Sequence, residues 1–306
     1  MLIVFGSINM DMIVKPEHLP QSGETVLCKE YDLQPGGKGA NQALAACRMG
    51  ARTALVGCAG EDSYSRQILD VIRRQGVITS GVKQSENYRT GCAMIMQEAN
   101  GANRIIVAAG ANNEATNDQV PDEILRPDSL ILTQTEVPSQ EVFALIRRAN
   151  DKGVKVIMNL APALDVPEEI LNMLHILVVN EIELDQVAKS LGLTGKGHVD
   201  MAHALAVRGK LTCIVTLAEK GSIVVTADGK PFHVSSLAVD VVDTTGAGDA
   251  YCGTLAACMY DGKSLEESVR WASVAGSLAC TKVGTIKAFA YQDDIKERLD
   301  EIVVTK

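Results

Sequence analysis

Short runs of apolar residues alternate along the chain with segments whose apolar residues recur at helical spacing. Seven runs have the length of buried strands, at residues 2–5, 54–57, 130–132, 154–158, 175–179, 211–216 and 222–226. Amphipathic segments that we predict to be helices lie between several of them, at 66–75, 140–151 and 184–191. This alternation predicts an α/β fold with a mostly parallel sheet and helices on both of its faces.

Two stretches interrupt the alternation. Residues 12–33 are extended and rich in turn residues, and residues 88–107 contain two apolar runs around Asn100-Gly101, a dipeptide typical of hairpin turns. We expect the two stretches to form a small accessory β-sheet that serves as a lid, although a pair of ordinary surface hairpins would give the same pattern. Because no repeat, charge run or linker divides the chain, we expect a single domain over residues 1–306.

Polar residues follow several of the predicted strands. They are Asn9, Asp11, Glu136, Asn159, Asn180 and Thr216. Each one alone is typical of a turn or a helix cap. Ligands of open α/β sheets bind outside the carboxyl ends of the strands, so the recurrence favours a shared cleft there.

A first glycine-rich segment, GGKGANQA at residues 36–43, leads into a predicted helix. Glycines before a helix let the backbone approach a ligand, and Lys38 and Asn41 add polar groups at the rim. The GxxxxGK[ST] pattern of a Walker A loop is absent. A loop followed by a capped helix without a ligand fits the spacing equally well.

A second glycine-rich segment, DTTGAGDA at residues 243–250, opens another predicted helix. The amides of Gly246, Ala247 and Gly248 would form an anion site at the helix N-terminus. Asp249 in that first turn can stabilise the helix, but beside a phosphoryl group it has the position of a general base. Because Tyr251 breaks the GxGxxG fingerprint, a nicotinamide enzyme is disfavoured.

Composition excludes several classes of protein. The 306 residues include 29 Lys and Arg against 38 Asp and Glu, and the net charge of −9 argues against a nucleic-acid partner. No apolar run approaches the roughly 18 residues of a membrane span, and the N-terminus lacks a basic signal-peptide region, so we expect no membrane partner. The eight cysteines form no CxxC pair and the five histidines no HExxH cluster. This pattern is typical of a cytoplasmic protein with reduced thiols and no zinc centre.

The two glycine-rich segments resemble the signatures of the ribokinase family of carbohydrate kinases, the PfkB group. Further segments with the family's order are GSINMD at 6–11, GET at 23–25, GAN at 110–112, NEIE at 180–183 and TLAEKG at 216–221. The resemblance therefore covers nearly the whole chain. It implies a three-layer α/β/α fold with a mostly parallel central sheet and a small β-sheet lid.

The resemblance also implies a reaction, the ATP-dependent phosphorylation of D-ribose at O5 to give D-ribose 5-phosphate. Asp249 would take the proton, and the amides of Gly246, Ala247 and Gly248 would stabilise the transferred phosphoryl group. The sugar would be bound by Asn9, Asp11, Gly37, Lys38, Gly39, Asn41 and Glu136. The nucleotide would be bound by Asn180, Thr216, Leu217, Ala218, Glu219, Lys220, Gly221, Gly248 and Ser273.

Cations and assembly follow from the same resemblance. The pattern from Asn180 to Glu183 is similar to a family motif associated with Mg²⁺ and phosphate. K⁺ would be bound by Asp243, Thr245 and carbonyls near Ala279, Lys282 and Gly284. The lid would form the contact of a homodimer.

Four positions depart from the common family pattern. Met10 stands between two expected sugar ligands, and its bulk could change which pentose fits. Residues 159–163 read NLAPA instead of NPAPA, Ser273 replaces a frequent His, and Ala288 replaces a Ser of the cation site. A kinase for deoxyribose, another sugar or a nucleoside, and a sugar-binding protein without catalysis, are the alternatives.

Overall fold

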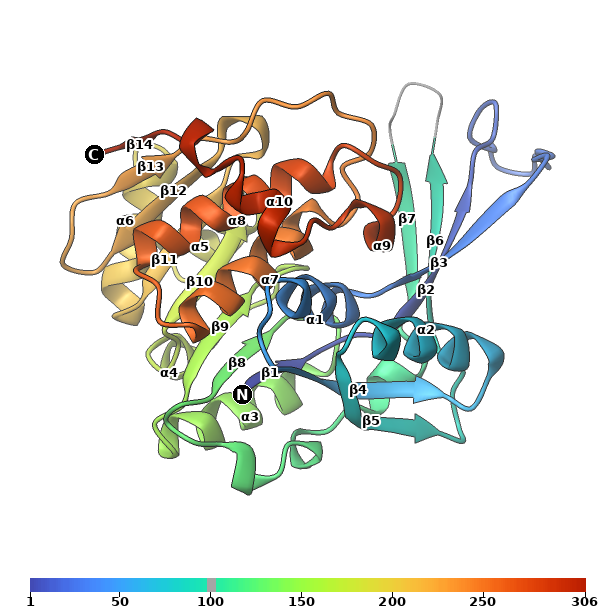
Figure 1. Cartoon of the computed structure of the whole chain (residues 1–306), viewed down its shortest axis with the longest axis horizontal. Helices are drawn as coiled ribbons and strands as arrows, with labels where there is room; N and C mark the ends of the chain where they lie inside the picture. The colour runs from blue at the N-terminus through green and yellow to red at the C-terminus, as the bar shows by residue number, and fades with distance from the viewer. Residues whose placement is uncertain (98–102) are drawn as a thin grey trace.

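The computed structural model describes residues 1–97 and 103–306 and, within them, contains one large and one small β-sheet (Figure 1). In spatial order the large sheet consists of β14 (Val304–Thr305), β13 (Phe232–Val234), β12 (Ser222–Thr226), β11 (Thr212–Thr216), β10 (Ile176–Asn180), β9 (Lys155–Asn159), β8 (Leu130–Thr133), β1 (Leu2–Phe5), β4 (Thr53–Gly60) and β5 (Ile78–Ser85). Neighbouring strands from β11 to β5 are parallel, and β12, β13 and β14 pair antiparallel at the other edge.

Helices cover both faces of this sheet. They are α1 (Lys38–Arg48), α2 (Ser63–Arg74), α3 (Ser139–Asp151), α4 (Glu168–Leu171), α5 (Glu181–Ser190), α6 (His198–Gly209), α7 (Ala247–Tyr260), α8 (Leu265–Ala279), α9 (Thr285–Ala288) and α10 (Gln292–Lys296). Short 3₁₀ turns lie at Gly110–Glu114, Asn117–Gln119, Asp122–Ile124, Ala218–Lys220 and Leu299–Glu301.

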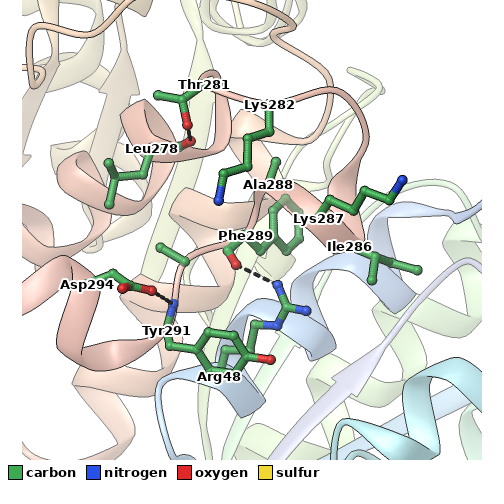
Figure 2. Close-up of a pocket in the computed structure, with 11 residues that line it drawn as sticks. Arg48, Leu278, Thr281, Lys282, Ile286, Lys287, Ala288, Phe289, Tyr291 and Asp294 are labelled. Atoms are coloured by element: carbon green, nitrogen blue, oxygen red, sulfur yellow. Dashed lines mark hydrogen bonds between the residues drawn. The ribbon is translucent and has the colours of Figure 1, made fainter.

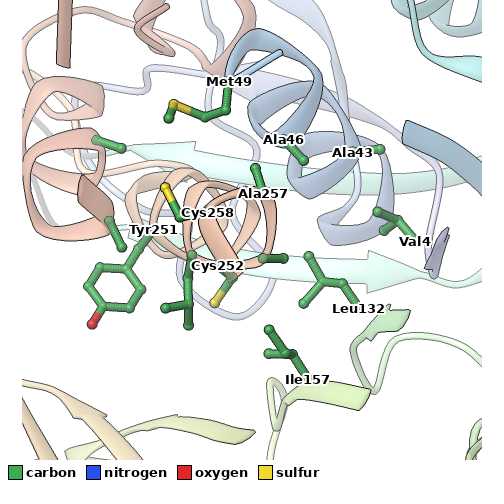
Figure 3. Close-up of a cluster of buried hydrophobic side chains, with 14 of the residues drawn as sticks. Val4, Ala43, Ala46, Met49, Leu132, Ile157, Tyr251, Cys252, Ala257 and Cys258 are labelled. Atoms are coloured by element: carbon green, nitrogen blue, oxygen red, sulfur yellow. The ribbon is translucent and has the colours of Figure 1, made fainter. Parts of the chain in front are cut away.

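The alternation of side chains in β1 divides the core into two halves. Leu2 and Val4 join a cluster with α1, α2, α7, α8 and α10, part of which is drawn in Figure 3. Ile3 and Phe5 join the cluster formed with α3, α4, α5 and α6 on the opposite face. The prediction of an α/β fold with helices on both faces is therefore confirmed.

The small sheet has the strand order β3 (Tyr31–Gly36), β2 (Asn9–Val14), β6 (Gly91–Gln97) and β7 (Asn103–Ala108). It projects to one side of the molecule (Figure 1). Two antiparallel pairs, β2–β3 and β6–β7, are joined by parallel pairing of β2 with β6. The expected Asn100-Gly101 turn lies outside the described residues. Because β2 begins at Asn9 rather than near residue 12, the expected sugar ligands Asn9 and Asp11 are residues of this sheet.

Most predicted strands match the observed ones to within a few residues, but β5, β13 and β14 were not predicted. β5 pairs only with β4 at the edge of the sheet and has a mixed burial pattern, so it lacks the continuous apolar run of a buried strand. The other two strands have only three and two residues. None of the described helices is long and apolar enough to span a membrane.

Candidate active site

The site is built around the N-terminus of α7. Gly246 caps the helix in the left-handed conformation with φ of 76°, and a Cβ there would lie 2.6 Å from the Thr285 side chain. Glycine therefore fits this turn both in backbone conformation and in space. The amide of Ala247 donates to the Thr244 carbonyl at 3.2 Å. A Cβ on Gly248 would meet no atom within 4 Å, so the helix presents an open N-terminal turn.

Close packing of α7 against α1 places Asp249 in the site. A Cβ on Gly253 would lie 2.4 Å from the Gln42 carbonyl oxygen and 2.7 Å from the Ala45 Cβ, so only glycine permits this approach. Asp249, one turn earlier on α7, is 7% exposed. Its Oδ1 accepts from Gln42 Nε2 at 2.9 Å, and its Oδ2 accepts from Asn41 Nδ2 at 3.0 Å.

Asp249 faces a cleft of about 250 Å³ that lies at the carboxyl ends of β9, β10 and β11. The cleft is lined by Lys38, Asn159, Ala161, Val178, Asn180, Glu183, Thr216, Thr244, Gly246, Gly248, Asp249 and Cys252. Seven of these lining residues belong to the predicted site. The prediction that polar residues at strand ends share one cleft holds for Asn159, Asn180 and Thr216.

Charged side chains gather at the end of the site next to the small sheet. Lys38 Nζ lies 3.8 Å from Glu136 Oε1, and Ser7 Oγ donates to Glu136 Oε2 at 2.6 Å. Burial would lower the pKa of Lys38, but the carboxylates of Asp249 and Glu136 outweigh it and raise that pKa above its ordinary value. Lys38 therefore carries a positive charge into a site that is otherwise acidic.

Asp11 is the most strongly perturbed carboxyl group of this cluster. Its burial, together with the negative charges of Glu136 and Asp249, raises the pKa of Asp11 to about 7, against the opposing effect of Lys38. A Cβ on Gly36 would lie 2.1 Å from the Asp11 carboxylate, so glycine in β3 makes room for it. Asp11 therefore titrates close to neutral pH.

Asn112 fixes the position of Asn9. Its Nδ2 donates to Asn9 Oδ1 at 2.7 Å, and its Oδ1 accepts from the Ile8 amide at 2.9 Å. Asn112 is 1% exposed and lies in the GAN segment at 110–112. That segment is part of the family resemblance, but none of its residues was expected to belong to the site. Met10, by contrast, is 1% exposed within the apolar core. Strand alternation places it on the opposite face of β2 from Asn9 and Asp11, which argues against the expectation that its bulk changes which pentose fits.

Gly37 and Gly39 lie at the start of α1. Gly37 caps the helix with φ of 89°, and the amide of Gly39 donates to Ser7 Oγ at 3.4 Å. A Cβ on Gly39 would lie 2.5 Å from the Gly6 carbonyl carbon. Gly39 therefore allows α1 to approach the turn between β1 and β2.

The expected nucleotide residues extend away from Asp249 along the strand ends. Asn180 and Thr216 are direct partners in the pairing of β10 with β11. Asn180 also caps α5, where its Oδ1 accepts from the Glu183 amide and Glu183 Oε2 accepts from the Asn180 amide, both at 2.8 Å. Burial raises the pKa of Glu183, with the Asn180 amide and Lys38 acting in the opposite direction.

The segment Thr216–Gly221 forms a tight turn in which the Leu217 amide donates to the Gly221 carbonyl at 2.7 Å. Thr216 lines the described cleft. The other expected nucleotide residues of this turn lie outside that lining; they are Leu217, Ala218, Glu219, Lys220 and Gly221. Ser273 lies on α8, is 5% exposed and is also outside that lining. Its Oγ has no hydrogen-bond partner within the described part of the chain.

Three of the expected cation ligands meet beside the start of α7. Asp243 Oδ1 accepts from the Thr245 amide at 3.0 Å and from its hydroxyl at 2.7 Å, and Asp243 Oδ2 accepts from the Gly284 amide at 3.2 Å. Ala279 ends α8, and Lys282 lies in the turn between it and Gly284. Among residues 1–97 and 103–306 no group of three His, Cys, Asp or Glu side chains could hold a metal ion.

A second cavity of about 430 Å³ lies between the end of α1 and the C-terminal segment, and its lining does not include Asp249 (Figure 2). Arg48 donates to the Phe289 carbonyl at 2.5 Å and to Gln75 Oε1 at 2.9 Å, and its guanidinium lies 4.7 Å from the ring centre of Tyr291. Arg48 thus connects α1 and the loop after α2 with the segment that follows α9.

Comparison with known proteins identifies the family of the chain. The model of the pfkB family carbohydrate kinases matches residues 1–290. Ribokinase of Haemophilus influenzae is 31% identical over 302 residues, which are 98% of each chain.

Solved structures give the same result. The crystal structure of ribokinase from Thermotoga maritima is 30% identical, with a TM-score of 0.90 over 98% of this chain and 99% of that one. Ribokinase of Arabidopsis thaliana, solved in complex with ribose and ATP, is 32% identical, with a TM-score of 0.87 over 97% and 98% of the two chains.

Proposed function

The chain belongs to the pfkB family of carbohydrate kinases, and we propose that it transfers the γ-phosphoryl group of ATP to O5 of D-ribose. The products are D-ribose 5-phosphate and ADP. The observation that carries this proposal is the position of Asp249, a buried carboxylate in the first turn of α7 that faces the cleft. The similarity to an Arabidopsis enzyme solved with ribose and ATP supports the choice of both substrates.

In the proposed reaction the sugar hydroxyl is the nucleophile. Asp249 takes the proton of the O5 hydroxyl as O5 forms its bond to the γ-phosphorus, and the bond from that phosphorus to the β–γ bridging oxygen breaks to release ADP. The amides of Gly246, Ala247 and Gly248 stabilise the charge on the transferred group. Because the Ala247 amide already donates to Thr244, we expect Gly246 and Gly248 to contribute most.

Of the expected sugar ligands only Lys38 lines the described cleft, so we assign ribose to the end of the site next to the small sheet and ATP to the opposite end. Ribose binds where Asp11, Lys38 and Glu136 meet, with Asn9, Gly37, Gly39 and Asn41 around it. ATP lies along the ends of β10 and β11, from Asn180 to the turn at Thr216–Gly221, with Ser273 on the side of the adenine. This order places the γ-phosphate next to Asp249, between the two substrate ends.

Two cations complete the proposal, and the donor atoms fit both. Mg²⁺ prefers oxygen ligands, so Glu183 beside Asn180 would hold it near the phosphates, directly or through water, where it neutralises negative charge. K⁺ would be held by Asp243, the Thr245 hydroxyl and carbonyls of Ala279, Lys282 and Gly284, which are all oxygen donors. Ala288 offers no hydroxyl, so backbone carbonyls carry more of this site.

We further propose that the small sheet acts as a lid over the sugar and as the contact surface of a homodimer. Its strands β6 and β7 expose the apolar side chains of Met94, Ile105, Ile106 and Val107. A cytoplasmic location suits an enzyme that consumes ATP and carries free cysteines.

The experiment that tests this function measures ADP release with ATP and Mg²⁺ against a panel of D-ribose, deoxyribose, hexoses and nucleosides, with and without K⁺. We expect D-ribose to give the highest kcat/KM and the product to carry phosphate on C5, as ¹H–³¹P coupling in NMR would show. Faster turnover of a nucleoside would reassign the substrate. Tight ribose binding without ADP release would make the chain a sugar-binding protein.

A further inference from the structure

Two glutamine side chains lie directly behind Asp249, and the proposed reaction gives them no role. Gln42 on α1 and Gln134, which follows β8, are both 0% exposed. Neither belongs to the lining of the described cleft. A buried amide is unfavourable unless its polar atoms are hydrogen-bonded, so their partners define what they do.

Gln42 uses every polar group of its side chain. Its Nε2 donates to Asp249 Oδ1 at 2.9 Å and to Asn159 Oδ1 at 3.1 Å, and its Oε1 accepts from Gln134 Nε2 at 2.6 Å. Three amides and one carboxylate are thus joined in a single buried network, contributed by α1, α7 and the ends of β8 and β9.

The carboxylate sets the direction of this network. An ionised Asp249 can only accept hydrogen bonds, so Gln42 must turn its NH₂ group toward it and its oxygen toward Gln134. Gln134 must then present its own NH₂ group to Gln42. The donors therefore run in one direction, from Gln134 through Gln42 to Asp249.

This orientation of the two amides leaves one polar atom of Gln134 without a hydrogen bond. With its NH₂ group committed to Gln42, Gln134 Oε1 is buried without a hydrogen-bond partner in the described part of the chain. A Cβ on Gly6 would lie 1.9 Å from that oxygen, so glycine in the turn after β1 makes room for the amide. A pair of glutamines that served packing alone would gain nothing from an unpaired buried acceptor.

The network also distinguishes the two carboxylate oxygens of Asp249. Oδ1 is bound by the fully buried Gln42, whereas Oδ2 is bound by Asn41, one of the expected sugar ligands. Oδ1 is therefore anchored in the core, and Oδ2 is the oxygen on the side of the sugar.

We propose that Gln134 and Gln42 form a buried relay that positions Asp249, holding Oδ1 so that Oδ2 accepts the proton of the sugar hydroxyl. Both are positioning residues, since they touch Asp249 or each other and not the substrate. The inference rests on the proposed function of Asp249 as general base. If the relay positions Asp249, kcat depends on Gln42 and Gln134 even though neither side chain contacts the sugar.

The test replaces each glutamine with methionine, which has a similar volume and cannot donate. ADP release is measured with whichever acceptor gives the highest turnover, so that failure of ribose as substrate leaves the test intact. For Gln42→Met we expect kcat to fall about 10-fold or more, part of the 10²-fold that a general base supplies, with KM for the sugar nearly unchanged. Gln134→Met should have a smaller effect in the same direction, and it tests the relay if Gln42→Met does not fold.

A double variant separates positioning from a general loss of structure. Because Gln42 acts through Asp249, Gln42→Met should not lower kcat further in an Asp249→Asn background. Equal proportional losses in both backgrounds, or wild-type kcat in Gln42→Met, would overturn the relay, whereas an Asp249→Asn variant with full activity would overturn the function instead.

Gln119 provides the matched control, since its Nε2 donates to the carbonyls of Gly57 and Gly81 and it belongs neither to the network nor to the lining of the described cleft. Gln119→Met should leave kcat unchanged. A readout independent of turnover is the ¹³C chemical shift of the Asp249 carboxyl carbon. We expect it to move in Gln42→Met and Gln134→Met and to stay in place in Gln119→Met; an unmoved shift in the first two would contradict the relay.

Discussion

At the scale of single residues, Asp11 shows a conflict between binding and stability. Its carboxyl group is 8% exposed and close to Glu136 and Asp249, and its pKa is raised from 3.8 to about 7. The folded state therefore retains a proton that the unfolded chain has already released above pH 4. Folding is favoured by this group at low pH, and that contribution is lost as the pH rises toward 7.

Asp11→Asn should therefore stabilise the free protein. The gain is expected to be greatest above pH 7, where the shift of Asp11 corresponds to about 4 kcal/mol, and to vanish below pH 4. Melting temperatures of both proteins across this pH range would measure it, and a lower melting temperature for the variant at pH 8 would contradict the account. The same variant should raise KM for ribose, because a carboxylate acceptor is replaced by an amide.

The residues that could be predicted from the sequence were those in glycine-rich segments and at strand ends, such as Lys38, Asn41, Asn180 and Asp249. Gln42 stands in the same segment, but the sequence around it does not indicate that its side chain hydrogen-bonds to Asp249, 207 positions further along the chain. Gln134 and Asn112 are likewise defined only by tertiary contacts. Met10 was expected to affect the sugar site because its sequence neighbours Asn9 and Asp11 are expected sugar ligands. Strand alternation instead turns its side chain to the opposite face of β2, into the apolar core.

At the scale of elements, the site depends on how closely α7 approaches α1. Both helices are buried on nearly all sides, and they approach each other closely at Gly253. Since Asp249 lies one turn from Gly253, the spacing of the two helices sets the distance from the carboxylate to Asn41 and Gln42. The position of the base is therefore a property of helix packing as well as of its own turn.

Gly253→Ala should push the two helices apart. We expect a loss of about 1–3 kcal/mol in the free energy of unfolding from overpacking, accompanied by a lower kcat as Asp249 moves. Chemical denaturation combined with ADP release would measure both. Gly248→Ala on the same helix is the steric control, because its Cβ meets open space and should leave the stability unchanged or higher; equal destabilisation by the two substitutions would contradict this explanation.

The inner parallel strands of the large sheet could be predicted because they are buried on both faces and appear as continuous apolar runs. β5 could not, since one edge strand with a single neighbour carries exposed polar residues. The start of β2 was placed too late because its first residues, including Asn9 and Asp11, are buried polar groups. Element boundaries were thus least predictable where the site itself is formed.

At the scale of the whole molecule, the distribution of charge and apolar surface matters more than their totals. The net charge of −9 does not oppose an anionic nucleotide, because the site offers helix amides and one half-buried lysine to it. The small sheet exposes Met94 and Ile106, which are direct partners in the pairing of β6 with β7 and therefore share one face, at 41% and 56% exposure. Monomeric proteins rarely leave such apolar groups together in solvent, which supports the proposed dimer contact.

Ile106→Lys should dissociate the dimer. Light scattering is expected to give about 65 kDa for the wild type, twice the 32.6 kDa of one chain, and half of that for the variant. Val207→Lys, at an exposed position of α6, is the control and should keep the wild-type mass. A wild-type mass near 33 kDa would contradict the proposed assembly.

The most direct test of the proposed phosphoryl transfer is the rate of ADP release with D-ribose by the wild type and by Asp249→Asn. The substitution keeps the volume of the side chain and removes its ability to take a proton. The account predicts ribose-dependent ADP release by the wild type and a loss of kcat of at least about 10²-fold in the variant, with KM for ribose nearly unchanged. Near-normal turnover by Asp249→Asn would contradict it.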